Sequence, residues 1–220
     1  MIHYAITIAR GYGSGGRRIG QKLADRLDVD FVDRELLQLA SIESGINEEL
    51  FGEVDERLKR PLLFKSRKNR LGEVLSPAED GFISDENLFN FQAKVLRSLI
   101  ERESFVVIGR AADFVLKEYP NVLSVSVQAP HPHCVTETMH KLGYDEKDAD
   151  AFIVKTDKYR ADFYEFYTGR RWNDPLNFDL CLNSGRLDDD ACLALIERAA
   201  ALKFGPDFSV PEKGVPQNAL

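Results

Sequence analysis

The segment GYGSGGRR at residues 11–18 decides the fold of this chain of 220 residues. It comes after the apolar run YAITI at residues 4–8 and before Ile19, Leu23 and Leu27, which recur at four-residue spacing. That order predicts a strand, a glycine-rich turn and a helix with one buried stripe. Backbone N–H groups and the positive end of the helix dipole at such a turn bind anions, provided that bulky side chains do not block the approach. We therefore predict a phosphate-binding loop, with an ordinary tight turn as the alternative.

The segment departs from the common phosphate-loop pattern G-x-x-x-x-G-K-[ST] at its last two positions. Its first and last glycines match, but Arg17 stands at the lysine position and Arg18 at the hydroxyl position. Arg17 keeps the positive charge in a larger, planar group, whereas Arg18 cannot ligate Mg²⁺ as a hydroxyl does. The predicted nucleotide-binding residues are Gly11, Gly13, Ser14, Gly15, Gly16, Arg17 and Arg18.

Short apolar runs alternate with helical patterns along the rest of the chain. Strands are predicted at residues 31–32, 105–108, 122–127 and 178–182, because these runs are short and continuous. Strands alternating with helices predict an α/β fold, with a parallel sheet whose ligand site lies beyond the carboxyl ends of the strands. In the last helix, which begins at Asp188, we expect these residues to face inward: Cys192, Leu195, Ile196, Ala199 and Leu202.

The length of the chain favours one domain over residues 1–205. A helical excursion is predicted at about residues 45–100, and it contains the basic stretch KRPLLFKSRKNR at 59–70. That stretch either forms a solvated surface or provides positive charge that screens the negative charge of a substrate. A second helical segment is predicted at about 130–172, and residues 206–220, which lack periodicity, are expected to form a loose tail.

Charge and composition exclude several classes of protein. The formal net charge of −7 argues against a general nucleic-acid binder, which would normally carry a basic surplus. Cys134, Cys181 and Cys192 lack metal-ligand spacing and fit free, reduced thiols in a core. No apolar run reaches the ~18 residues of a membrane span, and no leader pattern is evident, so we expect a cytoplasmic protein without membrane contact.

Charged residues directly follow two of the predicted strands. Asp33 ends the second strand, and its alternative role is to cap the next helix. Arg110 follows the buried run FVVI, a place where a charge usually meets a ligand or a partner. His131 and His133 have no Cys, Asp or Glu nearby at metal-ligand spacing, so we expect no metal site there.

The segment DKYRADFYEFYTGRRW at residues 157–172 places cations among aromatic side chains. Phosphoryl transfer needs cations around the migrating group, because its charge spreads over several oxygens. Arg17, Lys158 and Arg160 are therefore the candidate catalytic residues. The alternative for this segment is an ordinary helix with solvated charges, and its aromatic residues are expected to pack in the core.

Together these segments resemble the cytidylate kinase-like family, P-loop proteins related to nucleoside monophosphate kinases. The resemblance covers roughly residues 4–203 and rests on ITIARGYGSGGRRIG, FVDRELL, FQ at 91–92, VVIGRAADFVL, DKYRADFYEFYTGRRW and DLCLNS. It implies a three-layer P-loop fold with a five-stranded parallel sheet, ATP with Mg²⁺ at the glycine loop, an acceptor region in the excursion and a lid at about 130–172. By this resemblance the acceptor is bound by Asp33, Arg110, Asp157 at the ribose, and Arg160 at the phosphate.

Two further segments depart from the cytidylate kinases. The Ser-Gly and phosphate-binding arginine expected after Asp33 are replaced by RELL at residues 34–37. The first lid helix contains HPHCVTET, with Cys134 and Glu137 at positions where arginines are expected. The acceptor contacts of the family therefore cannot be transferred to these places.

The sequence favours an ATP-dependent phosphotransferase of the nucleoside monophosphate kinase type, with a CMP-like acceptor. The loss of the loop lysine, the hydroxyl and the lid arginines leaves a second hypothesis open, a nucleotide-binding regulatory or scaffold protein without catalysis. A kinase for another small phosphate acceptor is the third.

Overall fold

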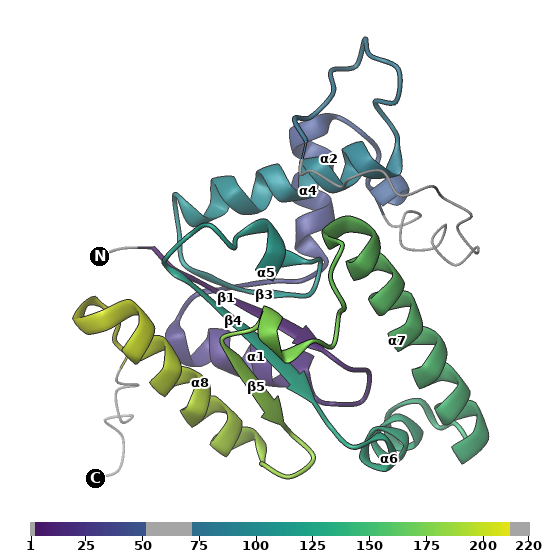
Figure 1. Cartoon of the computed structure of the whole chain (residues 1–220), viewed down its shortest axis with the longest axis vertical. Coiled ribbons are helices and arrows are strands. Elements are labelled where there is room, and N and C mark those ends of the chain that lie inside the picture. Colours follow the sequence, from purple (N-terminus) through teal and green to yellow (C-terminus); the bar gives the residue numbers. More distant parts are fainter. Residues whose placement is uncertain (1–2, 52–71, 212–220) are drawn as a thin grey trace, which may run out of the picture.

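The computed structural model describes residues 3–51 and 72–211 and contains the predicted parallel sheet (Figure 1). Its strands are β1 (Ala5–Arg10), β2 (Asp30–Val32), β3 (Phe105–Ile108), β4 (Val122–Gln128) and β5 (Leu180–Asn183). They lie in the order β2-β3-β1-β4-β5, and every pairing is parallel. The basic stretch at 59–70 lies outside the described residues.

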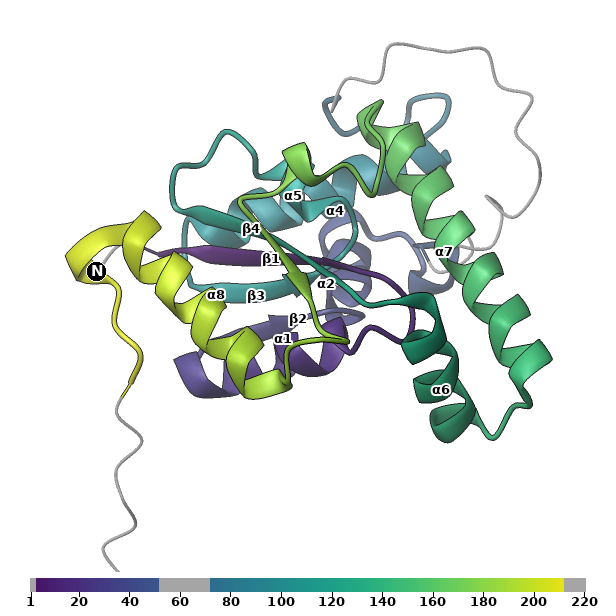
Figure 2. The same cartoon turned by 60° about the horizontal axis from the view of Figure 1, so that its bottom comes forward.

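Helices cover both faces of this sheet. They are α1 (Gly16–Leu27), α2 (Glu35–Ser44), α4 (Asp85–Ile100), α5 (Ala112–Val115), α6 (His131–Leu142), α7 (Glu146–Thr168) and α8 (Asp189–Phe204), with short 3₁₀ turns at Pro175–Asn177 and Gly205–Asp207. Figure 2 shows α1 and α8 on one side of the sheet and α4 and α5 on the other. The fold is therefore the predicted three-layer α/β arrangement.

The alternation of side chains along the strands builds two separate cores. Ile6 and Ile8 of β1 pack with α1 and α8, whereas Ala5 of β1 and Val107 of β3 face α2, α4, α5 and α7. Successive residues of a strand point to opposite faces, so a continuous apolar run serves both layers. Because the strands are parallel, the residues that follow each strand lie at the same edge of the sheet.

Gly20 allows α1 to lie directly on the sheet. A Cβ atom at this position would come within 2.6 Å of Ile108 Cδ1 and 3.1 Å of Ile8 Cδ1. The close approach holds the first turn of α1, and the glycine loop before it, against the ends of β1 and β3.

The helices α6 and α7 form a pair beyond the carboxyl ends of the strands (Figures 1 and 2). Asp145 caps α7 by accepting a hydrogen bond from the Asp148 N–H, and Gly169 ends the helix with φ 68°, both of which are common helix boundary signals. The aromatic residues of α7 pack as expected, because the Tyr167 ring stacks on Phe89 of α4 with centroids 4.0 Å apart. In the part of the chain that the structure describes, no helix has the length and apolarity needed to cross a membrane.

Several details at the carboxyl-terminal end differ from the prediction. Leu195 and Leu202 are 44% and 70% exposed, so the inward face of α8 is formed instead by Cys192, Leu193, Ile196 and Ala200. Cys181 is exposed, whereas Cys134 and Cys192 are buried as predicted. Phe208 is buried and its ring contacts Tyr4 and Phe204, so the tail is packed at its start, and residues 212–220 lie outside the description.

A buried hydrogen bond fixes α7 to the sheet layer. The hydroxyl of Tyr164 donates to the Asp113 carboxylate of α5 over 2.5 Å, and Asp113 is only 9% exposed. Burial raises the pKa of Asp113 from 3.8 to about 6, against the opposing effect of the Tyr164 hydrogen bond. The folded state therefore holds this proton more tightly than the unfolded chain does.

Asp113→Asn should remove a pH dependence of stability. Because the folded pKa is raised, the wild-type carboxyl costs nothing below about pH 4 and lowers the free energy of unfolding progressively up to about pH 6. The full cost is about 3 kcal/mol. Urea unfolding of both proteins between pH 4 and pH 7.5 measures the difference, and a difference that stays constant over this range would contradict the assignment.

Candidate functional site

The carboxyl ends of the strands bring the predicted polar residues to one edge. The glycine loop follows β1, Asp33 follows β2, and Arg110 comes two residues after the end of β3. Helix α7 reaches the same edge, because Asp157 contacts the loop backbone. Parallel sheets bind ligands at this edge, and the residues that the sequence singles out gather here from distant segments.

The glycine loop has a backbone that only glycine adopts readily. Gly13 and Gly15 have φ values of 77° and 75°, a left-handed conformation that is costly for other residues. A Cβ atom on Gly13 would lie 2.6 Å from the carbonyl oxygen of Cys134, and one on Gly16 would lie 2.6 Å from Arg10 Cβ. The loop is therefore wedged between β1 and the first lid helix, α6.

Several N–H groups of the loop are left for a ligand. The N–H groups of Gly11, Tyr12, Ser14 and Gly16 have protein acceptors. Among the described residues, no acceptor takes the N–H groups of Gly13, Gly15, Arg17 or Arg18. Gly15 caps α1 without a side-chain hydrogen bond, and the first turn of α1 holds no acidic residue. These are the features of a helix N-terminus that binds an anion.

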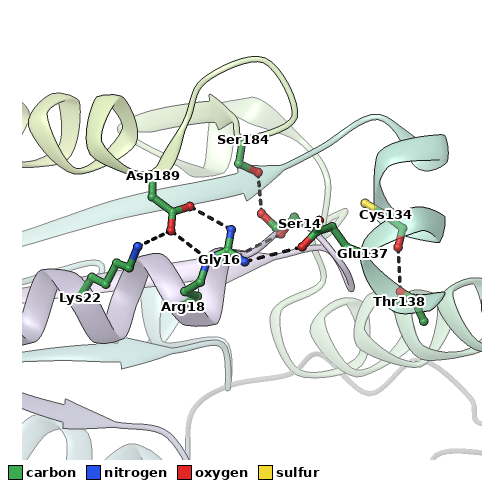
Figure 3. A network of polar contacts seen from close by, with 9 residues as sticks. All are labelled: Ser14, Gly16, Arg18, Lys22, Cys134, Glu137, Thr138, Ser184 and Asp189. Atoms are coloured by element: carbon green, nitrogen blue, oxygen red, sulfur yellow. Dashed lines mark hydrogen bonds and ion pairs between the residues drawn. The ribbon is translucent and has the colours of Figure 1, made fainter. Parts of the chain in front are cut away.

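Two serines hold the loop in this shape. The Ser14 hydroxyl donates to the Gly11 carbonyl oxygen over 2.9 Å, and the Ser184 hydroxyl donates to the Ser14 carbonyl oxygen over 2.6 Å, as Figure 3 shows for the second contact. Ser14 is 1% exposed, so its side chain stabilises the loop from the buried side. Its place in the predicted nucleotide site is that of a scaffold residue.

The side chain of Arg18 points from the loop toward α8. Its guanidinium makes two hydrogen bonds with Asp189, at 2.8 and 3.0 Å, and lies 3.6 Å from Glu137 of α6. Lys22 contacts the same Asp189 carboxylate (Figure 3). The hydrogen bond from Arg18 is the main cause that holds the pKa of Asp189 below its usual value. Arg18 therefore links α1, α8 and the lid.

Arg17 points to the opposite side, toward β2. Its Nε donates to Asp33 over 2.6 Å, and its guanidinium lies over the Phe31 ring at 5.5 Å from the centroid. The Arg17 side chain is 61% exposed and that of Asp33 is 14% exposed. The structure thus pairs a predicted catalytic residue with a predicted acceptor residue.

Asp157 of α7 joins the lid to the glycine loop. Its Oδ1 accepts hydrogen bonds from the Tyr12 N–H at 2.8 Å and from Arg160 at 3.0 Å. Arg160 also donates to the carbonyl oxygen of Arg10 over 3.2 Å. Burial raises the pKa of Asp157 and lowers that of Arg160, while their mutual attraction acts against both shifts.

The lid contributes less than the sequence predicts. Lys158 is bound to Asp162 of its own helix over 2.9 Å with a side chain 72% exposed, so the structure does not bring it to the loop. Cys134 lies on the buried face of α6, and burial raises the pKa of its thiol to about 11. The His131 imidazole contacts Asp150 at 2.6 Å.

Arg10 is a site residue that sequence reasoning missed. It is the last residue of β1, directly before Gly11, and its side chain is partly buried. Arg110 has a left-handed backbone with φ 59°, between Gly109 at 68° and Ala111 at 51°. A charged residue that ends an apolar strand was the signal for Arg110, and the same signal at the end of β1 identifies Arg10.

Comparisons with known proteins identify the family and the fold of this chain. The model of the cytidylate kinase-like family matches residues 5–186. A solved structure of an uncharacterized protein from Eubacterium ventriosum has 25% sequence identity, a TM-score of 0.66, and coverage of 90% of this chain and 98% of that one. Shikimate kinase from Bacteroides thetaiotaomicron shares the fold at 12% identity and a TM-score of 0.50, with coverage of 89% and 97%.

No curated protein matches the sequence. The family match nevertheless extends from the first residue of β1 through all five strands of the sheet. It includes the glycine loop, Asp33, Arg110 and the lid helices. The chain belongs to the cytidylate kinase-like family.

Proposed function

We propose that this protein is an ATP-dependent phosphotransferase that moves the γ-phosphoryl group of ATP to a nucleoside monophosphate of the CMP type. The observation that carries the proposal is the uncapped N-terminus of α1 with its set of unpartnered loop N–H groups. Such groups bind phosphate through the backbone and do not depend on the side chain at the lysine position. Membership of the kinase-like family supports the same chemistry.

The loop fits the phosphates of ATP better than it fits a protein-bound metal. Arg18 stands where a hydroxyl would ligate Mg²⁺, and its guanidinium is bound to Asp189. The Ser14 hydroxyl is engaged with the loop backbone. Mg²⁺ keeps several waters and commonly binds through substrate phosphates, so the metal would arrive as the ATP complex.

The acceptor would lie on the β2 and β3 side of the loop, between Asp33, Arg110 and Arg160. Asp157 Oδ1 is occupied, but Oδ2 makes no hydrogen bond among the described residues and can accept one from a ribose hydroxyl. Arg17 would stabilise the charge that develops during transfer after leaving Asp33, and Arg160 would contact the migrating group. Lys158 can act only if it leaves Asp162.

One observation favours the second function, nucleotide binding without transfer. Both arginines of the loop are held by carboxylates outside it, Arg17 by Asp33 and Arg18 by Asp189. A protein that has lost the chemistry could keep these ion pairs permanently. A kinase must release at least the Arg17 pair during turnover.

A coupled ADP-release assay with Mg²⁺–ATP separates the two functions. We expect turnover with CMP or another nucleoside monophosphate, and ATP should raise the melting temperature. ATP-dependent stabilisation without ADP release from any nucleoside monophosphate or broader metabolite panel would favour the regulatory protein. The absence of any nucleotide effect on melting would contradict both functions.

Gly15→Val should abolish ATP binding measured by calorimetry. The new side chain fills the space at the loop N–H groups, and even its Cβ would lie 3.0 Å from Arg18 Nη2. Gly45→Val is the matched control, because Gly45 has a similar φ of 70° but nothing within 4 Å of its Cβ position. ATP binding that survives Gly15→Val in a folded protein would show that the loop is only a turn.

Arg17→Ala should lower kcat by about tenfold or more, with a smaller effect on ATP affinity. The reason is that a cation beside the transferring phosphoryl group acts mainly on the transition state. Arg26→Ala controls for loss of a similar ion pair on the same helix, since Arg26 contacts Glu197 at 2.8 Å. An unchanged kcat would remove Arg17 from the catalytic residues.

A further inference from the structure

Arg10 is the last residue of β1, and its guanidinium reaches the turn directly after β3. Its Cβ lies close to Gly16, and its Nη1 lies close to Gly109. A Cβ atom on Gly109 would overlap Nη1, which shows how closely the guanidinium approaches this turn. The Arg10 guanidinium therefore lies next to the turn that presents Arg110.

The acids around Arg10 are already engaged with other groups. Asp33 accepts from Arg17 at 2.6 Å, and Asp157 accepts from the Tyr12 N–H and from Arg160. Within the described ranges, no hydrogen bond or ion pair joins the guanidinium of Arg10 to an acceptor. A partly buried guanidinium with five donors and no acceptor is costly, and an oxyanion would remove that cost.

Two further guanidinium groups act on the same place. Burial, followed by the neighbouring charges of Arg160 and Arg110, lowers the pKa of Arg10 to about 9, against the opposing charges of Asp33 and Asp157. The three arginines come from β1, from the turn after β3 and from α7. Like charges assembled from three elements in a protein of net charge −7 indicate a site for an anion.

We propose that Arg10 binds the phosphate group of a phosphomonoester acceptor, together with Arg110 and Arg160. This inference rests on the proposed function and identifies which residue replaces the phosphate-binding arginine missing after β2. Arg34 cannot serve there as it stands, because it is the exposed N-cap of α2. Arg10 leans toward Gly109, on the β3 side of the loop, so it faces the acceptor rather than the N–H groups that would hold ATP.

Calorimetric titration with CMP and with inorganic phosphate tests this role. Each titration is made with and without saturating β,γ-imido analogue of ATP, which cannot be hydrolysed and fills the glycine loop. The variants are Arg10→Met, which keeps the length of the side chain, and Arg10→Lys, which keeps the charge. Arg102→Met is the control, since Arg102 is exposed and donates only to a carbonyl oxygen of its own helix end.

Arg10→Met should weaken CMP and phosphate binding by about tenfold or more, as expected for loss of a charge-assisted contact. Arg10→Lys should recover part of that loss, and the control should bind like the wild type. The affinity for the ATP analogue should change by less than about twofold. Because the Arg10 guanidinium has no hydrogen-bond or ion-pair partner among the described residues, the melting temperature of ligand-free Arg10→Met should not fall.

Unchanged binding of both probes by Arg10→Met would overturn the proposal. It would also be overturned if the variant lost affinity for the ATP analogue instead, or if the wild type bound neither CMP nor phosphate. Should Arg10→Met not fold, the same comparison between Arg10→Lys and the wild type decides. Binding that depends on Arg10 in a protein that releases no ADP would end the phosphotransferase proposal and leave the phosphate site standing.

Discussion

The carboxylate of Asp157 is the contact on which the arrangement of the site depends. One oxygen accepts the N–H of Tyr12 in the glycine loop and the guanidinium of Arg160. Arg160 in turn donates to the backbone of Arg10 at the end of β1. A single partly buried acid therefore joins the loop, helix α7 and the central strand. Burial raises the pKa of this acid, and the charge of Arg160 acts against that shift.

Ion pairs determine where the two arginines after the last glycine of the loop point. Arg17 is held by Asp33 on the β2 side, and Arg18 is held by Asp189 on the α8 side. The two arginines that follow the loop are thus drawn apart, which leaves the backbone N–H groups between them accessible. In the function that we propose, the main chain of this loop would recognise phosphate, and the side chains would act beside it.

Helices α6 and α7 contact the rest of the structure in two places. Near the sheet, the Tyr164 hydroxyl binds Asp113, and the ring of Tyr167 stacks on Phe89. Closer to the ligand edge, the first lid helix packs against Gly13 and reaches Arg18 through Glu137. Glu137 and Cys134 stand where arginines are expected in a cytidylate kinase. In the function that we propose, cations for the acceptor would therefore come from elsewhere, and we propose Arg10 of β1 as one of them.

The sequence alone determined the elements whose signals are local. Apolar runs, four-residue spacing and the glycines of the loop predicted the strands, the helices and the glycine-rich turn between β1 and α1, because such propensities act over a few residues. The exposed Leu195 and Leu202 show the limit of spacing, since their burial depends on which neighbours cover the helix. Only the tertiary structure decided the partners of the charges, as Arg18 meets Asp189 and Tyr12 meets Asp157 across 171 and 145 residues. Pairs so distant in sequence are chosen by the packing of the whole sheet, and that packing gives the Arg10 guanidinium no hydrogen-bond acceptor within residues 3–51 and 72–211.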